Sequence, residues 1–191
     1  NHQNKSYLSD TNSDLINAYL QIRNHVKNLF QIIDSFKNEE SYYYYIRDEY
    51  SPKNKLEEAA RFIYLNRTCY NGLYRVNLSG KFNVPFGRKK YLALFDYELM
   101  YNLSKKLKQS KLFCSDFYDT IKNVQKNDLV FLDPPYNITK SNNGFIKYNE
   151  KLFNLSDQSR LADYVNELSK IGARYYLTNS VHEIIKGLFP V

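Results

Sequence analysis

The sequence predicts an α/β fold, in which a parallel sheet with crossover helices is interrupted by a long inserted segment. From Lys111 onward, short apolar runs alternate with segments of helical periodicity, and this alternation is typical of parallel sheets. Residues 36–95 break the alternation and carry a tyrosine run, glycines and a basic cluster. We therefore expect an α/β domain formed by residues 1–35 and 96–191, with residues 36–95 as an inserted domain.

The elements before residue 96 are assigned from hydrophobic spacing and turn residues. Tyr7-Leu8-Ser9 predicts the end of a short strand, and the apolar residues between 15 and 33 recur at helical spacing. Asn12 or Ser13 can cap that helix. The inserted segment predicts a helix from about Lys55 to Cys69 and then a β-hairpin that turns at Ser79-Gly80.

After residue 96, helices and strands alternate. Helices are expected over Asp96–Gln109, Tyr118–Val124 and Ser156–Ile171, the last one closed by Gly172. Strands are expected at Lys111–Ser115, Leu129–Leu132 and Ala173–Thr178. Because Leu129–Leu132 consists of four apolar residues in a row, we expect it to be a buried parallel strand.

The composition favours a polyanionic partner. The 191 residues carry a net charge of +7, with 19 Tyr and 12 Phe that can stack on nucleic-acid bases. An AT-rich genome explains the same surplus of Lys and Tyr without any function. Composition alone leaves both interpretations open.

Cysteine and histidine usage argues against a metal site. Cys69 and Cys114 lie far apart without a Cys-x-x-Cys spacing, and His2, His25 and His182 are scattered. The two cysteines fit reduced thiols in a cytosol. No run approaches the roughly 18 apolar residues of a membrane helix, and no secretory signal opens the chain, so we expect no membrane partner.

Asp133-Pro134-Pro135-Tyr136 follows the apolar run at 129–132 and predicts the catalytic centre. The carboxyl end of such a strand is where open α/β sheets bind ligands. These residue types suit a reaction at an exocyclic adenine amine, which is a weak nucleophile because its lone pair is delocalised into the ring. The Asp133 carboxylate and the Pro134 carbonyl can accept both amine hydrogens, and Tyr136 offers a flat face to a base that has left the duplex. The alternative is a strand-ending turn with an aromatic plug.

Four segments together resemble the Dam-type, alpha-group family of adenine-N6 DNA methyltransferases. The resemblance extends from about Ser9 to Ser180. The segments are Ser9-Asp10-Thr11-Asn12, residues 66–77 (Asn-Arg-Thr-Cys-Tyr-Asn-Gly-Leu-Tyr-Arg-Val-Asn), residues 80–88 (Gly-Lys-Phe-Asn-Val-Pro-Phe-Gly-Arg) and the Asp-Pro-Pro-Tyr motif. Weaker matches lie at 115–117, 156–161 and 177–180. The resemblance implies a Rossmann-like sheet that binds S-adenosyl-L-methionine, with an inserted, mainly helical DNA-recognition domain.

The same resemblance implies which residues bind the cofactor. Asp10 matches the acid that bonds the ribose hydroxyls, although on its own it is better explained as an acid favoured near a helix N-terminus. Asp116 and Phe117 match the pair that holds the adenine ring of the cofactor. Asp133 is expected to border the cofactor as well as the target amine.

The hairpin resembles the family's DNA-reading element. Arg75 matches an arginine that contacts a base, and an arginine fork can bond both major-groove acceptors of guanine. Asn71 and Leu73 match the same recognition site, and Tyr70 matches an aromatic that enters the base stack. Further DNA contacts are expected from Arg88, with Lys89 and Lys90 on phosphates. The alternative is a basic hairpin that is exposed to solvent and does not bind DNA. The Tyr42–Tyr45 run is expected to pack in the core or on the surface rather than to stack on DNA.

The chain also departs from the family pattern. The glycine-rich first motif and the lysine segment before it match nothing here, nor do the final hairpin strands, so both ends of the fold are expected to be missing. A non-catalytic DNA-binding remnant therefore remains an alternative to the enzyme. A third interpretation is a methyltransferase for RNA or protein amino groups, against which the DNA-reading hairpin argues.

The expected function is methylation of adenine in double-stranded DNA, within GATC or another site that begins GAT. The resemblance implies a cytoplasmic protein encoded by a bacterium, an archaeon or a phage. It leaves open whether the enzyme serves restriction, a phage or genome maintenance. In a restriction system, a cognate restriction endonuclease would act on the same site without direct contact.

Overall fold

The computed structural model of the protein describes residues 5–89, 95–135, 153–179 and 187–189. The chain forms two compact units, residues 1–115 and residues 116–191. Among the described helices, none has the length and apolar character needed to reach across a bilayer.

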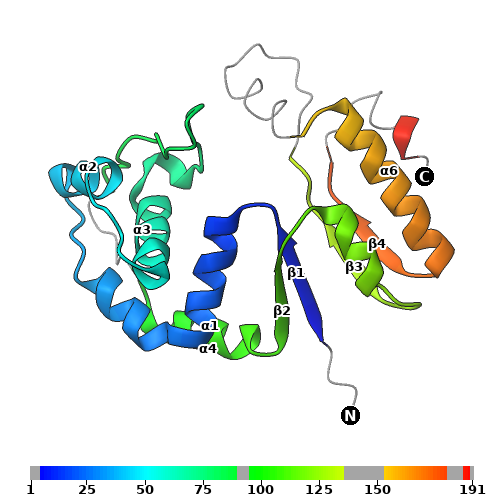
Figure 1. The fold of residues 1–191 in the computed structure, drawn as a ribbon, viewed down its shortest axis with the longest axis horizontal. Coiled ribbons are helices and arrows are strands. Elements are labelled where there is room, and N and C mark those ends of the chain that lie inside the picture. The colour runs from blue at the N-terminus through cyan, green and yellow to red at the C-terminus, as the bar shows by residue number, and fades with distance from the viewer. Residues whose placement is uncertain (1–4, 90–94, 136–152, 180–186, 190–191) are drawn as a thin grey trace. The chain divides into compact units, whose positions relative to one another are not determined.

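The described residues of the first unit form a parallel strand pair and several α-helices (Figure 1). In chain order its elements are β1 (Ser6–Asp10), α1 (Ser13–Asp34), α2 (Glu40–Asp48), α3 (Lys55–Thr68), the 3-10 helix η1 (Tyr70–Gly72), α4 (Tyr97–Leu107) and β2 (Ser110–Cys114). Strand β1 pairs with β2 in parallel, with Asp10 opposite Cys114. The carboxyl ends of these two strands therefore lie side by side.

Side-chain caps explain where the helices of this unit begin. The Asn12 side chain accepts hydrogen bonds from the backbone at the start of α1, so the cap is Asn12 rather than Ser13. Asn54 caps α3 and Asp96 caps α4 in the same way. Helix α1 departs from helical geometry at His25, where φ is −138°. The predicted helices are thus confirmed, with boundaries that differ by one or two residues.

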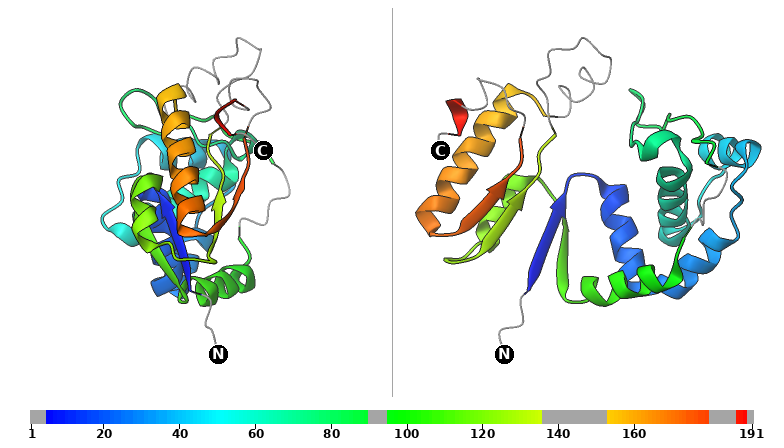
Figure 2. Two further views of the ribbon diagram at one scale, coloured as in Figure 1. Left: turned by 90° about the vertical axis from the view of Figure 1, so that its right-hand side faces the viewer. Right: turned by 180° about the vertical axis from the view of Figure 1, so that it is seen from behind.

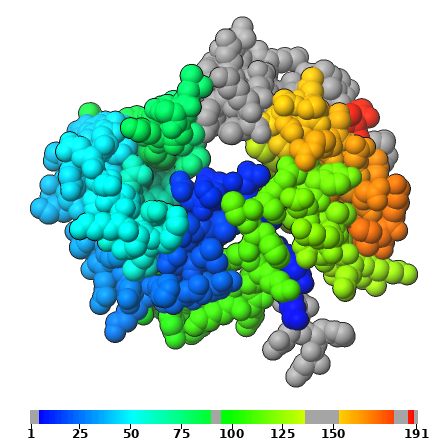
Figure 3. Space-filling model, viewed as in Figure 1, coloured from blue at the N-terminus to red at the C-terminus, as the bar shows by residue number. Residues whose placement is uncertain are grey.

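Helices α1 and α3 pack against each other around an apolar core. Leu29 and Ile33 of α1 and Tyr64 of α3 are completely buried, and Tyr43 from the tyrosine run is buried with them. The buried Tyr43 hydroxyl donates a hydrogen bond to Val84 O (2.8 Å), which satisfies its polar atom. In the space-filling view the atoms of α1, α2 and α3 form one continuous surface (Figure 3). The packing role expected for this run is confirmed at Tyr43.

The described residues of the 36–95 segment form no core of their own. Its buried residues belong to the same cluster as Ala18, Ile22 and Leu29 of α1, with Met100 and Leu107 of α4. Packing therefore divides the chain after residue 115, whereas the sequence divides it by expected function at residues 36 and 95. The functional division stays a prediction.

The second unit is a parallel strand pair covered by helices. Its elements are the 3-10 helix η2 (Phe117–Asn123), β3 (Leu129–Leu132), α6 (Leu155–Ile171) and β4 (Arg174–Leu177). Leu132 and residues of α6 such as Leu161, Tyr164 and Leu168 form its core. Figures 1 and 2 show α6 lying along one face of the β3–β4 pair.

Helix α6 has strong signals at both ends. Asn154 and Asp157 form a reciprocal capping box, in which each side chain accepts a hydrogen bond from the other residue's backbone N–H. Gly172 ends the helix with φ at 80°, a left-handed conformation that a Cβ would strain. These signals place the start and the end of α6 within a residue of the prediction.

Among the described residues, the strands form two parallel pairs, one in each unit, and the single sheet stays a prediction. Two other expectations need correction. Strand β3 is buried on one face only, because α6 covers that face, whereas Leu129 and Phe131 on the other face are 59% and 67% exposed. The segment after Asp116 forms a 3-10 helix instead of an α-helix, since its backbone bonds close after three residues, as from Val124 N to Ile121 O.

The predicted hairpin is also smaller than expected. Only isolated antiparallel bridges form there, between Val76 and Phe82 and between Cys69 and Phe86. Gly80 has φ at 75°, and Gly80 N donates to Asn77 O (3.0 Å), so the chain does turn near the predicted position. Side-chain contacts hold this segment in place of a longer ladder of backbone hydrogen bonds.

Gly87 rests on the end of α3 and yields a test of the packing. Its N–H donates to Thr68 O (2.8 Å), and a Cβ at this position would lie 2.5 Å from Cys69 O. We expect Gly87→Ala to lower the free energy of unfolding by about 1–3 kcal/mol, as overpacking does. Urea denaturation of the purified protein measures this. Gly187→Ala is the control, because a Cβ there meets nothing within 4 Å; equal stabilities of the two variants would contradict the packing.

Candidate functional site

Asp133 directly follows β3, and the end of the neighbouring strand holds its carboxylate. Parallel pairing of Leu132 with Leu177 brings Asp133 beside Thr178. Thr178 Oγ1 donates a hydrogen bond to Asp133 Oδ1, and Thr178 N donates to Leu132 O (3.0 Å). The exposed Asp133 carboxylate is thus oriented at the carboxyl end of the strand. Pro134 is half-buried, and Tyr136 lies outside the described residues.

The end of β4 is tied in turn to helix α6. Asn179 Nδ2 donates to Gln158 Oε1 (2.9 Å), and Gln158 is completely buried in the first turns of α6. Gln158 Nε2 has no hydrogen-bond partner among the described residues. The sequence assigned no role to Thr178 or Gln158, although both lie in segments that match the family. Only strand pairing shows that Asp133 and Thr178 are neighbours, and only the packing of α6 shows that Gln158 contacts Asn179.

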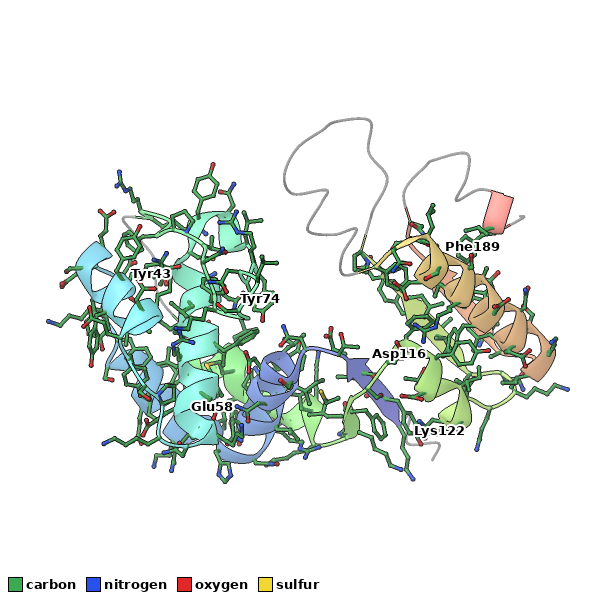
Figure 4. The ribbon with its side chains drawn as sticks, turned by 45° about the horizontal axis from the view of Figure 1, so that its top comes forward. Tyr43, Glu58, Tyr74, Asp116, Lys122 and Phe189 are labelled. Carbon is green, nitrogen blue, oxygen red and sulfur yellow. The ribbon has the colours of Figure 1, made fainter. Side chains whose placement is uncertain are left out.

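Asp116 and Phe117 meet the same helix at Arg160. Asp116 Oδ1 accepts hydrogen bonds from Tyr118 N (2.9 Å) and from Arg160 Nη2 (2.7 Å). The Arg160 guanidinium carbon lies 5.1 Å from the centre of the Phe117 ring, which also packs edge-on against Tyr164 (5.7 Å between centroids). The hydrogen bond to Asp116 is the main cause that raises the Arg160 pKa. Figure 4 labels Asp116 at the start of η2.

Asp10 ends β1 and turns back onto its own chain. Its Oδ1 accepts a hydrogen bond from Asn12 N (2.7 Å), just before α1 begins. Ser115 N donates to Asp10 O (3.2 Å), so the residue before Asp116 is bonded to the end of β1. The local structure is therefore the helix-start acid that residues alone favour, and it leaves the cofactor role of Asp10 a prediction.

The predicted DNA-reading residues occupy the 70–89 segment of the first unit. Tyr70 is 52% exposed, Asn71 adopts a left-handed backbone with φ at 52°, and Leu73 is half-buried against the core. Arg75 is half-buried, and Asn83 holds its guanidinium: Nε donates to Asn83 Oδ1 (2.8 Å) and Nη2 donates to Asn83 O (3.2 Å). Asn83 is a further residue to which sequence reasoning assigned no role.

The basic residues at the end of this segment are exposed. Arg88 has φ at 53° and forms an ion pair with Glu40 (3.0 Å) in which both side chains are largely exposed. Lys89 is exposed, and its carbonyl accepts a hydrogen bond from Asn38 Nδ2 (2.9 Å). Lys90 lies outside the described residues.

Hydrogen bonds fasten the 70–89 segment to the helices beneath it. Gly87 N donates to Thr68 O of α3 (2.8 Å), and two side chains of α2 donate to Val84 O, from Tyr43 Oη (2.8 Å) and from Arg47 Nη1 (3.1 Å). Within the segment, Tyr70 N donates to Pro85 O (2.8 Å). Figure 4 labels Tyr43 in α2 and Tyr74 in this segment.

The structure thus brings some of the predicted residues together within each unit. Asp116, Phe117, Asp133 and Pro134 belong to the second unit, where α6 contacts Asp116 through Arg160 and the strand end beside Asp133 through Gln158. Asp10 and the described DNA-reading residues belong to the first unit.

Comparison with known proteins finds a family and individual relatives that are all named as methyltransferases or methylases. The family described as D12 class N6 adenine-specific DNA methyltransferase matches residues 1–189. A type II methyltransferase of Methanocaldococcus jannaschii is 40% identical over 92% of this chain and 65% of its own length. A type II methyltransferase of Lactococcus lactis subsp. cremoris is 34% identical over 97% and 68%, and a DNA adenine methylase of Serratia marcescens is 36% identical over 85% and 62%. The chain therefore spans about two thirds of the length of these relatives.

Proposed function

Because the chain belongs to the D12 class N6 adenine-specific DNA methyltransferase family, we propose that the whole protein methylates adenine at N6 in double-stranded DNA. The methyl donor in this proposal is S-adenosyl-L-methionine. The observation that carries the proposal is the oriented carboxylate of Asp133 at the end of β3, fixed by Thr178. Relatives named as DNA adenine methylases support it.

In the proposed reaction, the protein must orient the adenine N6 amine, a weak nucleophile, toward the methyl group of the cofactor. Asp133 and the Pro134 carbonyl accept hydrogen bonds from the two amine hydrogens of a flipped adenine. These contacts localise the nitrogen lone pair, so that it points away from the base plane. Because Thr178 already engages Oδ1 of Asp133, the carboxylate needs no reorientation when the base arrives.

The residues present suit the adenosine part of the cofactor. Asp116 uses Oδ1 for two structural hydrogen bonds, and among the described residues its Oδ2 has no partner, which leaves an acceptor for an adenine amine. Phe117 supplies an aromatic ring next to it, and Asp10 supplies a carboxylate for the ribose hydroxyls. When bound, the cofactor supplies an electrophilic methyl group.

DNA reading is assigned to the 70–89 segment. Asn83 engages Nε and one Nη2 hydrogen of Arg75, so Nη1 and the second Nη2 hydrogen remain to contact both acceptors of a guanine. Tyr70, Asn71 and Leu73 complete the reading surface, while Arg88, Lys89 and Lys90 contact phosphates. We propose a site that begins GAT, with GATC as the first candidate.

One experiment tests the proposed reaction and the proposed site together. Random-sequence DNA is incubated with the full-length protein and S-adenosyl-L-methionine, and N6-methyladenine is mapped by sequencing. The expected result is methylation of adenines that are preceded by guanine and followed by thymine. DNA that gains no N6-methyladenine would contradict the reaction, and methylation without a preceding guanine would contradict the role of Arg75.

A second experiment addresses the hydrogen bond between Thr178 and Asp133. We expect Thr178→Val to slow single-turnover methyl transfer about 10-fold to 100-fold, because a hydrogen bond to a charged group contributes about 1.5–3 kcal/mol. Thr178→Ser keeps the hydroxyl and should stay near the wild-type rate. Equal rates in the Val and Ser variants would show that the bond does not orient Asp133.

A further inference from the structure

Arg160 occupies a position at which one side chain touches both residues expected to hold the cofactor's adenine. Its Nη2 donates to Asp116 Oδ1 (2.7 Å), and its guanidinium carbon lies 5.1 Å from the centre of the Phe117 ring. Its Nη1 donates to Asp157 Oδ1 (3.2 Å). A planar guanidinium can make these three contacts at once, whereas an ammonium group would act as a single point charge.

A carboxylate of the capping box at the start of α6 also holds the Arg160 guanidinium. Asp157 Oδ2 accepts a hydrogen bond from Asn154 N (2.9 Å), while its Oδ1 accepts from Arg160. Both oxygens of Asp157 are therefore engaged, one with the helix cap and one with the arginine. The position of the Arg160 guanidinium therefore depends on the start of α6 and not only on its surface contact with Asp116.

The two carboxylate oxygens of Asp116 have different surroundings. Oδ1 accepts from Tyr118 N and from Arg160, and Oδ2 has no partner among the described residues. An exocyclic adenine amine is a donor that fits an acceptor of this kind. Without the arginine, Tyr118 N alone would hold the carboxylate, which could then rotate and exchange its oxygens.

Stability is a poor explanation for this arrangement. The Arg160 side chain is 45% exposed and Asp116 is 37% exposed, and exposed ion pairs contribute only about 0–1 kcal/mol to stability. The core of this unit is built instead from α6 residues such as Leu161 and Tyr164. An exposed arginine with two carboxylates and a ring as partners is better explained by the positions that it imposes on them.

We propose that Arg160 is a positioning residue for adenine recognition in the cofactor. It fixes the orientation of the Asp116 carboxylate and the position of the Phe117 ring, over which its guanidinium lies, and it does not itself contact the transferred methyl group. The inference rests on the proposed function, because it takes the cofactor's adenine as the ligand of Asp116 and Phe117. It adds a residue to which neither the sequence motifs nor the family description gives a role.

The test measures cofactor selectivity, which a merely structural residue would not alter. Binding of S-adenosyl-L-homocysteine and of S-inosyl-L-homocysteine to the full-length protein is compared by calorimetry. The inosyl compound replaces the amine donor with a carbonyl, so the wild type should bind the adenosyl compound more tightly. Arg160→Ala should weaken adenosyl binding about 10-fold, as expected for loss of about 1.4 kcal/mol, and reduce the preference over the inosyl compound.

Two further variants separate position from charge and from folding. Arg160→Lys keeps the positive charge without the fork and should resemble Arg160→Ala in selectivity, even if the alanine variant folds poorly. Lys170→Ala is the matched control, because it removes an exposed cation of the same helix that pairs with Glu167 (2.7 Å). It should leave both affinities unchanged. Methyl transfer at saturating cofactor should fall much less than cofactor affinity in the Arg160 variants.

The outcomes distinguish this inference from the function on which it rests. A wild-type protein that binds neither compound overturns both. A wild type that prefers the adenosyl compound, together with Arg160 variants of unchanged affinity and selectivity, overturns only the role of Arg160. A loss of thermal stability in Arg160→Lys with selectivity intact would likewise show that the residue serves folding alone.

Discussion

Asp133→Ala is expected to lower the rate of methyl transfer by about 100-fold to 1,000-fold or more, the range seen when a transition-state hydrogen-bond partner is removed. The physical reason is that the adenine amine then lacks the acceptor that localises its lone pair. Single-turnover methylation with saturating DNA and cofactor isolates this step from binding. DNA affinity should persist, because the described DNA-reading residues lie in the other unit.

Two companion variants sharpen this result. Asp133→Asn keeps the shape but exchanges a carboxylate oxygen for an amide donor, and it should lose nearly as much activity as the alanine variant. Asp163→Ala removes an exposed carboxylate from α6 and should remain near wild type. More than a few per cent of wild-type turnover in Asp133→Ala would remove this residue from the catalytic step.

Arg75→Ala is expected to reduce affinity for the cognate site by about 1–3 kcal/mol and to relax discrimination at one guanine. Loss of a fork onto guanine leaves the remaining contacts able to hold DNA without reading that base pair. Binding to the cognate duplex, and to duplexes that carry each other base at that position, measures both effects. An unchanged preference for guanine would assign base reading to another residue.

Substitutions at Asn83 and Lys89 separate base reading from phosphate contact. Asn83→Ala removes the acceptor that orients Nε of Arg75, so it should copy the loss of discrimination in weaker form, by about 1 kcal/mol. Lys89→Ala should weaken all DNA sequences alike and reduce the slope of log affinity against log salt by about 1. A Lys89 variant with altered sequence preference would contradict a phosphate contact.

The elements of the fold could be predicted where local signals are strong. The caps at Asn12 and Gly172 and the apolar run at Leu129–Leu132 mark element ends that the structure reproduces within one or two residues. Burial of β3 could not be predicted, because it depends on what covers the second face of the strand. The hairpin was overestimated because its segment is held by side chains such as Tyr43 and Arg47 rather than by a ladder.

The candidate site shows the same division between local and long-range information. Asp133 and Asp116 could be singled out from motifs, since each directly follows a predicted strand. Their partners Thr178 and Arg160 lie 45 and 44 residues further along the chain. No periodicity or turn signal links such distant positions, so the contacts follow only from parallel strand pairing and from the packing of α6.

The hydrogen bonds that fasten the 70–89 segment to α2 and α3 have a consequence for the thermodynamics of DNA association. A loop that becomes ordered only on binding loses conformational entropy, about 0.5–1.5 kcal/mol for each side chain that is immobilised. A segment already bonded to the helices beneath it, as at Val84 and Gly87, has lost most of that freedom during folding. DNA would then meet a preformed surface, and substitutions in the buried core under the segment would alter site discrimination without touching DNA.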